Sequence, residues 1–298
     1  MDKTKLLAGN QDLRSASQPR NIYGSKKENG RVMIIGGGGD YHGAPVLASN
    51  AAYNTLAALR IGTGYAFLYV PKAILAPARK LSPSLIVVPF GKDNIGQGNF
   101  NAIKSAIQKA DSLVIGMGIG RKPSTLKMAS RIISYAIKLN KKIVVDADAI
   151  YSIKRLGRMG KNVILTPQDM EFYELSGKKL DKRSLSKRAT AAISLAKKLD
   201  SCVLLKGHDT IITDGKALKV VSSHSSSLAT MGTGDVLSGI IGGYMATGIE
   251  TFKAGVAGAY LHSVIGDLLH RKKGNHILSS DIEELIPSTL RKFDRAAG

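Results

Sequence analysis

Short apolar runs rich in β-branched residues alternate along most of this chain with longer segments of helical period. The short runs are continuous in apolar character, which is typical of strands covered on both faces of a parallel sheet. They span residues 32–35, 65–70, 85–88, 112–115, 142–146, 163–166 and 203–205, and the helical segments span 45–59, 100–110, 125–139 and 185–199. This order predicts right-handed β-α-β units and hence an α/β fold, with a mainly parallel central sheet and helices on both faces.

The pattern changes after Leu205. Residues 210–213 and 217–221 flank Asp214-Gly215, a strong signal for a two-residue hairpin turn. We therefore expect antiparallel strands at one edge of the sheet.

The last part of the chain is predicted to be helical. Segments rich in alanine and glycine span residues 235–246 and 252–270. Ser280 and Glu283 have the Ser-x-x-Glu spacing of a capping box, which predicts a last helix that ends near residue 293. Because no repeat, linker or low-complexity segment is evident, we expect a lead-in of residues 1–29 followed by a single domain over residues 30–298.

The chain is strongly basic, because 43 Lys and Arg residues outnumber 22 Asp and Glu residues and leave a net charge of +21. Such a charge attracts nucleic acid, acidic membranes or phosphorylated small molecules. The densest basic stretch, residues 178–188, lacks interleaved aromatic side chains, so we interpret it as the solvated face of a surface helix. A polar N-terminus, the absence of a membrane-length apolar run and a single cysteine, Cys202, lead us to expect a soluble cytoplasmic protein.

A glycine-rich turn, Gly232-Thr233-Gly234, runs directly into an apolar helical segment. Glycines let the backbone approach a ligand, and the first N–H groups of a helix have no partner within it, so such a turn can bind a phosphoryl group. The adjacent carboxylate of Asp235 could then accept a proton from a hydroxyl group. The same residues could also serve only to begin a helix, with Asp235 as a stabilising N-terminal acid.

Three further turns rich in glycine or small residues, at 36–45, 116–120 and 206–210, each follow a predicted strand. Ligands of open parallel sheets bind at the carboxyl ends of the strands, and this favours a binding site over a mere helix start. Lys206 in the third turn suits a nucleotide phosphate or ribose. Tyr41 stands where a dinucleotide-binding fingerprint needs its third glycine, and no Gly-Lys-Ser/Thr is present, so hydride-transfer enzymes and P-loop proteins are disfavoured.

Taken together, these segments resemble the NAD(P)H-hydrate dehydratase family, whose members have a ribokinase-like fold. The resemblance covers about residues 31–290 and consists of motifs in a fixed order. These are Gly36 to Gly39 with Tyr41-x-Gly43-Ala44-Pro45, Gly116-x-Gly118-x-Gly120, Asp146-Ala147-Asp148, Thr166-Pro167 with Glu171, Leu205-Lys206-Gly207, Gly232-Thr233-Gly234-Asp235 and Tyr260-Leu261-His262.

The resemblance implies an enzyme that removes water from the C6-hydrated, damaged forms of NADH and NADPH, driven by cleavage of ADP or, less commonly, ATP. It implies phosphorylation of the C6 hydroxyl followed by elimination of the phosphate, with Asp235 as the base. The N–H groups of Gly232, Thr233 and Gly234 would stabilise the transferred phosphoryl group. Mg²⁺ is expected to bridge the nucleotide phosphates.

The family's motifs also assign binding roles to matching positions. Ala44, Gly118, Gln168 and Asp235 would bind the hydrated dinucleotide, whereas Lys206, Gly207, His208, Asp209, Thr210 and Gly234 would bind the adenine nucleotide. Glu171 would orient metal-bound water, or alternatively would act as a helix-capping acid. Asp146 and Asp148 lie at a strand end, where a structural turn and a polar contact are both open, and we do not assign them to catalysis.

Several positions depart from the family pattern. Gln168 stands where His is usual, Met117 where Pro is usual, Gly38 where Ser is usual, and Ser225-Ser226-Ser227 replaces an Asn-Pro-Gly-like approach to the glycine turn. Glutamine forms hydrogen bonds but cannot ionise near neutral pH, so a proton-transfer role at this position would be lost.

The main alternative is a kinase of the same fold that phosphorylates a hydroxymethylpyrimidine or a hydroxyethylthiazole, because the same anion site and base would serve it. From a different class, a non-enzymatic nucleic-acid binder would account for the net charge but not for the glycine turns, and nucleic acid is therefore disfavoured as a partner. We also expect a homo-oligomer without membrane association, and an epimerase, if one acts with this protein, on a separate chain.

Overall fold

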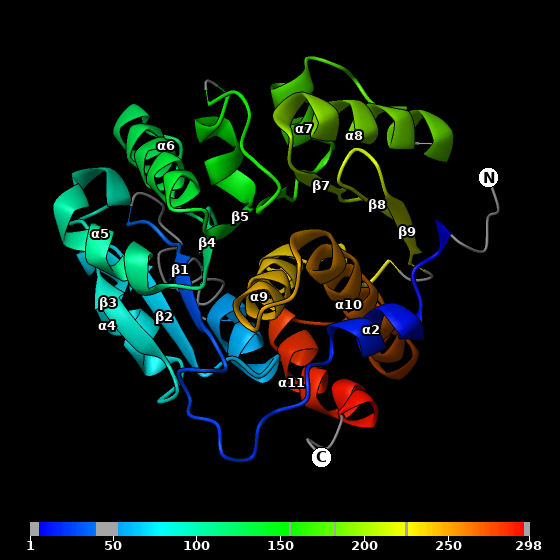
Figure 1. Cartoon of the computed structure of the whole chain (residues 1–298), viewed down its shortest axis with the longest axis horizontal. Coiled ribbons are helices and arrows are strands. Elements are labelled where there is room, and N and C mark those ends of the chain that lie inside the picture. The colour runs from blue at the N-terminus through cyan, green and yellow to red at the C-terminus, as the bar shows by residue number, and fades with distance from the viewer. Residues whose placement is uncertain (1–5, 40–52, 155, 182, 224–225, 295–298) are drawn as a thin grey trace.

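The central sheet is mainly parallel. The computed structural model describes residues 6–39, 53–154, 156–181, 183–223 and 226–294. Within these residues nine strands form one sheet in the order β3-β2-β1-β4-β5-β6-β7-β8-β9 (Figure 1). The strands are β1 (Arg31–Ile35), β2 (Tyr65–Val70), β3 (Ile86–Pro89), β4 (Ser112–Ile115), β5 (Lys142–Val145), β6 (Val163–Leu165), β7 (Cys202–Leu205), β8 (Asp209–Thr213) and β9 (Leu218–Ser222). Neighbours from β3 to β7 pair in parallel, and β8 and β9 are antiparallel, so the predicted fold class is confirmed.

Helices cover both faces of this sheet, which curves around helix α9 (Figure 1). The helices are α2 (Asn10–Ala16), α4 (Leu75–Lys80), α5 (Phe100–Lys109), α6 (Pro123–Lys138), α7 (Asp169–Ser176), α8 (Leu185–Leu199), α9 (Thr233–Ala246), α10 (Thr251–Lys273) and α11 (Ser279–Leu290), with short 3-10 helices at Lys72–Ile74, Ile95–Gln97, Ala147–Ser152 and Arg291–Phe293. Residues 53–60 are also helical. Helices α5, α6 and α8 pack on one face, and α9, α10 and α11 pack on the other.

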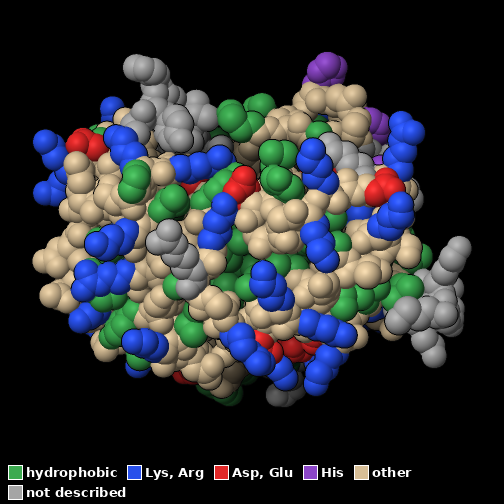
Figure 2. Space-filling view, turned by 90° about the horizontal axis from the view of Figure 1, so that it is seen from above, with side chains coloured by type: hydrophobic (Ala, Val, Ile, Leu, Met, Phe, Trp, Pro, Cys, Tyr) green, Lys and Arg blue, Asp and Glu red, His purple; other side chains and the backbone are tan. Residues whose placement is uncertain are grey.

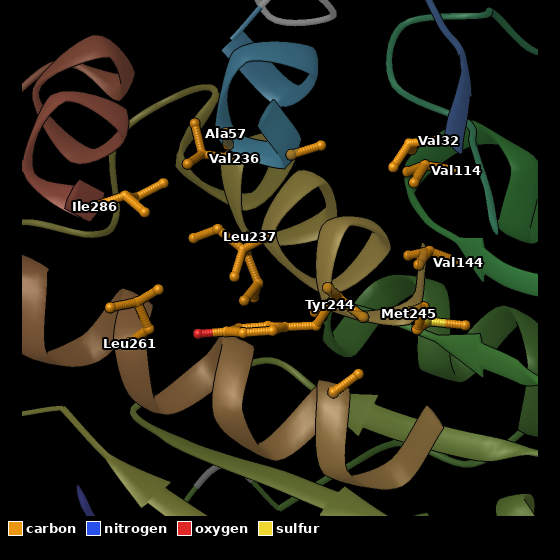
Figure 3. Packing of buried hydrophobic residues seen from close by; sticks show 14 of the residues in the cluster. Val32, Ala57, Val114, Val144, Val236, Leu237, Tyr244, Met245, Leu261 and Ile286 are labelled. Carbon is orange, nitrogen blue, oxygen red and sulfur yellow. The ribbon is translucent and has the colours of Figure 1, made fainter. Parts of the chain in front are cut away.

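Successive side chains along a strand pack alternately into two hydrophobic cores, one on each face of the sheet. Val32 and Ile34 of β1 join the core around α9, whereas Met33 and Ile35 of the same strand join the core around α5 and α6. Successive side chains of a strand point to opposite faces, so a strand buried on both faces must be apolar throughout. Figure 3 shows the first core, where Tyr244 of α9 lies among apolar side chains from the sheet and neighbouring helices.

The hairpin at the antiparallel edge differs from the prediction. Thr213 of β8 lies opposite Leu218 of β9, so the connection is a four-residue loop over residues 214–217 and not a two-residue turn. The carboxylate of Asp214 accepts hydrogen bonds from the N–H groups of Lys216 and Ala217 at 2.8 and 2.7 Å. This side chain stabilises a longer loop that the Asp-Gly pair alone did not reveal.

The start of the last helix was also predicted in the wrong register. Helix α11 begins at Ser279, and the capping acid is Asp281, whose carboxylate accepts a hydrogen bond from the N–H of Leu278 at 2.9 Å. Glu283 is instead buried and forms an ion pair with Arg60. The Ser-x-x-Glu spacing is present in the sequence, but the glutamate pairs with an arginine far away in the sequence and does not cap the helix.

The first described residues pack onto the domain. Leu13 of α2 is fully buried, and the N–H of Ala8 donates to the carbonyl of Val220 in β9 at 2.9 Å. Helix α2 lies against α10 (Figure 1). None of the described helices has the length and apolar character needed to cross a membrane.

Basic side chains outnumber acidic ones on the face of the molecule that Figure 2 shows. On this face the Lys and Arg side chains are scattered and do not form a single stripe of the kind that tracks a nucleic-acid backbone.

Helix α9 reaches its central position because it is rich in glycine. A Cβ added at Gly242 would lie 2.3 Å from a methyl carbon of Val114 in β4, and one added at Gly239 would lie 2.1 Å from the carbonyl oxygen of Asn54. These glycines let the helix lie directly on the sheet and on the helix of residues 53–60. The glycine at the end of the Gly232–Gly239 motif is therefore explained by packing.

We predict that Gly239→Ala destabilises the protein although alanine favours helices. The added methyl would collide with backbone, and overpacking of this kind costs about 1–3 kcal/mol, more than the roughly 1 kcal/mol that alanine gains in a helix. Urea unfolding followed by circular dichroism should show a lower midpoint. Ser105→Ala on the exposed side of α5 is the control, and an unchanged midpoint in Gly239→Ala would contradict this packing.

Candidate functional site

The turns predicted to bind ligands lie at one edge of the sheet. Strand β1 pairs with β2 on one side and with β4 on the other. Strands β2 and β3 are therefore added on one side of β1 and the later strands on the other, and β1 lies where the strand order reverses. Open α/β sheets bind ligands in the crevice outside the strands at such a switch point. There the N–H of Gly37 donates to the carbonyl of Met117 at 2.7 Å, and a Cβ added at Gly38 would lie 3.0 Å from the carbonyl oxygen of Gly118. The turns after β1 and β4 therefore touch.

Backbone hydrogen bonds continue this edge past the ends of β5, β6 and β7. The N–H of Asp146 donates to Ile115, that of Thr166 to Val145, and that of Lys206 to Pro167, at 3.1, 3.1 and 2.9 Å. The residues just after these strands are consequently held side by side. Asp146 and Lys206 come together in this way although 60 residues separate them in the sequence.

The side chain of Lys206 forms an ion pair with Asp146. Its Nζ donates to Oδ1 of Asp146 at 2.8 Å, and Oδ2 of the same carboxylate accepts a hydrogen bond from Ser238 at 2.6 Å. Burial opposes the charged form of both groups, but their mutual attraction prevails and leaves the pKa of Asp146 lowered and that of Lys206 raised. A Cβ added at Gly234 would lie 3.6 Å from the Lys206 Nζ, so the ammonium lies beside the start of α9.

Hydrogen bonds from Thr233 and His262 hold the turn before α9 in place. Thr233 is buried, and its hydroxyl donates to the carbonyls of Leu228 and Thr230 at 2.7 and 2.8 Å. Its N–H also donates to Thr230, at 3.3 Å. Nε2 of the buried His262 lies 2.9 Å from the carbonyl oxygen of Thr233, and burial lowers the pKa of this histidine to about 4, so the neutral ring donates.

These contacts divide the glycine turn into two parts. The hydroxyl and N–H of Thr233 both donate to preceding residues, whereas the N–H groups of Gly232 and Gly234 form no hydrogen bond with the described residues. Gly232 has a positive φ of 87°, a conformation that favours glycine. Together with the positive end of the helix dipole, these two N–H groups offer donors to an anion.

Asp235 lies in the first turn of α9, next to these donors, and is partly buried. Burial raises its pKa to about 7, with a further increase from the charge of Asp146 and a decrease from Lys206. Asp148 and Glu171 add smaller increases. A carboxylate with a pKa near neutrality is suited to accept a proton from a hydroxyl and to release it again.

Glu171 and Gln168 lie at the start of α7. One carboxylate oxygen of Glu171 accepts a hydrogen bond from the N–H of Gln168 at 2.7 Å, which is the helix-capping geometry. Burial raises the pKa of Glu171, and the charge of Lys206 opposes this increase. Glu171 therefore caps the helix and also faces the charged cluster.

Asp148 supports the turn after β4. Its two carboxylate oxygens accept hydrogen bonds from the N–H of Gly120 at 3.0 Å and from Nε of Arg121 at 2.8 Å. The guanidinium of Arg121 also lies 3.9 Å from the ring centre of Tyr151. Sequence reasoning left Asp146 and Asp148 unassigned, and the signal that could have found them was the pair of acids at the end of a buried strand.

Arg188 corrects the interpretation of the basic segment at residues 178–188 as a solvated face. It is only 4% exposed, and its guanidinium pairs with Asp169 at 2.7 Å and donates to the carbonyl of Lys206 at 2.9 Å. A Cβ added at Gly207 would lie 2.5 Å from this guanidinium. Arg188 thus holds the backbone of the Lys206-Gly207 turn from beneath.

The rest of the predicted nucleotide segment is more open. His208 is 82% exposed in its side chain, Asp209 accepts a hydrogen bond from Ser222 at 2.6 Å, and the hydroxyl of Thr210 donates to Gly207 at 3.2 Å.

Ala44 lies outside the described residues. A hollow of about 390 Å³ among the described residues lies elsewhere, between α5 and strands β1 and β2, and contains none of the predicted site residues.

Fold and site together define a class. A mainly parallel sheet has the free N–H groups of a helix start, a lysine and a carboxyl group of raised pKa together at one edge, and enzymes that transfer a phosphoryl group to a small hydroxylated molecule use groups of these kinds. The fold is ribokinase-like. The structure of a ribokinase-like superfamily protein from Enterococcus faecalis matches with a TM-score of 0.82 and 25% identity, over 96% of this chain and 95% of that one.

The chain belongs to the NAD(P)H-hydrate dehydratase family, whose model matches residues 32–288. It is 32% identical over 292 residues to the ADP-dependent (S)-NAD(P)H-hydrate dehydratase of Cenarchaeum symbiosum, covering 97% of this chain and 98% of that protein. The ADP/ATP-dependent NAD(P)H-hydrate dehydratase from Bacillus subtilis, co-crystallized with ATP/Mg²⁺, has a TM-score of 0.78 and 21% identity, over 96% of this chain and 98% of that one. The resemblance seen in the motifs is thereby confirmed.

We predict that Arg188→Lys weakens adenine nucleotide binding. Lysine keeps the charge but cannot bond Asp169 and the Lys206 carbonyl with one planar group, so the Lys206-Gly207 turn loses its support. The loss of a charged hydrogen bond corresponds to roughly a tenfold increase in the Kd for ADP. Calorimetric titration checks this, with Arg183→Lys on the exposed part of the same segment as control. An unchanged Kd in Arg188→Lys would show that the turn does not need this support.

We also predict that Asp235→Asn stabilises the fold above neutral pH. In the unfolded chain the carboxyl ionises near pH 4, but in the folded protein it does so only near pH 7, so stability falls as the pH rises from about 4 to 7. Asparagine removes this loss. The thermal midpoint of Asp235→Asn should exceed that of the parent at pH 8 and approach it at pH 4. If the difference in thermal midpoint between Asp235→Asn and the parent were the same at pH 4 and at pH 8, the raised pKa of Asp235 would be contradicted.

Proposed function

We propose that this chain restores hydrated NADH or NADPH to the intact dihydronicotinamide, using ADP or ATP as phosphoryl donor. The observation that carries the proposal is the meeting of three features at one edge of the sheet. These are the N–H groups at the start of α9, the ammonium of Lys206 and the carboxylate of Asp235. Family membership supports the substrate, and the geometry supports the roles of these residues.

In the proposed reaction Asp235 takes the proton of the C6 hydroxyl. The freed oxygen attacks the terminal phosphorus of the nucleotide, a new oxygen–phosphorus bond forms, and the bond to the next phosphate breaks, releasing AMP from ADP. Lys206 and the N–H groups of Gly232 and Gly234 stabilise the charge of the transferred group. The ring nitrogen lone pair then expels the phosphate from C6, and loss of a proton from C5 restores the double bond.

Magnesium would be held near Glu171 and the nucleotide phosphates. One oxygen of Glu171 is used by the N–H of Gln168, which leaves the other to orient a metal-bound water. Within the described residues no three carboxylate, histidine or cysteine side chains are arranged to hold a metal ion by themselves. This donor set suits Mg²⁺, which keeps several waters and takes phosphate oxygens as ligands. The ion would neutralise phosphate charge during transfer.

The proposal keeps the binding roles predicted from the family's motifs. Lys206 to Thr210 and Gly234 would contact the nucleotide, and Gly118, Gln168 and Ala44 would contact the hydrated dinucleotide. Gln168 is exposed at the start of α7 and can form hydrogen bonds to a substrate without moving a proton. The homo-oligomer and the separate epimerase stay predictions.

Incubation of the pure protein with hydrated NADH, Mg²⁺ and either ADP or ATP should restore the near-ultraviolet absorbance of the dihydronicotinamide. Free phosphate should be released in equal amount, whereas a kinase of hydroxymethylpyrimidine or hydroxyethylthiazole would leave the phosphate on its product. Absence of recovery with both nucleotides would refute the proposal.

Asp235→Asn tests the base. Turnover should fall by about 10²–10⁴-fold, the usual contribution of a general base, while ADP affinity stays within a few fold. Because the carboxylate must be ionised to act, kcat/KM of the parent should rise with pH up to about 7 and then level off. Retained turnover in Asp235→Asn would mean that another group accepts the proton.

A further inference from the structure

We propose that Asp146 is the positioning residue of this site, because its buried carboxylate holds the ammonium of Lys206 beside the start of α9. The proposal rests on the proposed function, in which Lys206 meets the transferred phosphoryl group. It assigns a role to an acid that would not touch the substrate.

The carboxylate of Asp146 has a partner at each oxygen, and the side chain of Thr166 also favours its ionised form. The side chain of Asp146 is 1% exposed, and the partners are Lys206 for Oδ1 and Ser238 for Oδ2. A carboxylate bonded on both sides cannot rotate without losing one bond. The geometry therefore fixes the direction in which Lys206 extends, toward Gly234.

The same contacts join three parts of the fold. Asp146 follows β5, Lys206 follows β7, and Ser238 lies in α9 one turn after Asp235. Through Ser238 the carboxylate bonds the helix that carries the base, and through Lys206 it bonds the turn that would carry the nucleotide. The two proposed binding segments are thus held in register by one side chain.

Charge explains why this position needs an acid. Asp235 and Glu171 also attract Lys206, and Lys206 in turn favours the ionised form of both. Without Asp146 the ammonium would be drawn to these carboxylates, one of which is the base. A base in an ion pair is a weaker proton acceptor, and an ammonium so engaged is withdrawn from the phosphoryl group.

Two other roles would account for a buried acid here. A purely structural ion pair would affect stability but not the chemistry, and a metal ligand would act independently of Lys206. A double-mutant cycle separates these roles, because two residues that act through one contact show non-additive effects.

The cycle compares Asp146→Asn, Lys206→Met and the double variant in the full-length protein with hydrated NADH, ADP and Mg²⁺. We expect Asp146→Asn to lower kcat by about 10²-fold, the magnitude of one lost electrostatic contact to the transition state. In the Lys206→Met background the same change should have little further effect. Full additivity of the two losses would overturn the proposal, and so would unaltered kcat in Asp146→Asn.

The pH profile gives a readout that a structural role would not move. The charged groups that face Asp235 are Asp146, Asp148, Glu171 and Lys206, and His262 near the same turn is neutral. Removing the charge of Asp146 and releasing Lys206 both favour ionised Asp235, so the rise of kcat/KM should move to lower pH. Ser238→Ala keeps the charge of Asp146 and should shift the rise much less. An unmoved rise in Asp146→Asn would contradict the role.

ADP affinity keeps the test independent of turnover. Calorimetry should show weaker ADP binding in Asp146→Asn and in Lys206→Met, with no further loss in the double variant. If the parent binds ADP but restores no NADH, the proposed function fails while this cycle still decides on Asp146. The double variant removes both charges of the buried Asp146–Lys206 pair together, so it keeps the test valid even if Asp146→Asn alone unfolds. Additive losses of ADP affinity would overturn the proposal.

Discussion

All strands of a parallel sheet that point the same way end at the same edge, and the chemistry of this protein depends on that constraint. Asp146, Thr166 and Lys206 follow three neighbouring strands, and the backbone N–H of each donates to the neighbouring strand or to the turn after it. Helix α9 must then begin at the same edge, which it does only because its glycines let it lie directly on the sheet. Residues far apart in sequence meet for this reason and not through any local motif.

The site holds more negative charge than its surroundings easily stabilise. Asp146, Asp148, Glu171 and Asp235 act electrostatically on Asp235 or on one another, and Lys206 and Arg121 are cations among them. Burial and these acidic neighbours raise the pKa of Asp235 to about 7, which costs folding stability at higher pH but suits the role of base that we propose for it. The interaction that limits this cost is the ion pair between Asp146 and Lys206.

Most of the fold was predictable, because continuous apolar runs between helical segments leave few arrangements. The start of α9 and Asp235 were also predictable, since a glycine turn before a helix has a direct physical meaning. Asp146 and Arg188 were not identified as supports of the site, because burial and ion pairing depend on distant partners that periodicity does not show. The register of α11 failed for the same reason, since Glu283 is bound by a distant arginine.

The proposed reaction requires that groups which donate hydrogen bonds to a phosphate, and a carboxylate that accepts a proton, face the same space at the start of α9. A crystal structure with ADP bound tests it most directly. We expect the terminal phosphate to accept hydrogen bonds from the N–H of Gly234 and from the Lys206 ammonium, with the Asp235 carboxylate facing the same space. A phosphate bound at another edge of the sheet, or an Asp235 side chain turned away from it, would contradict the account.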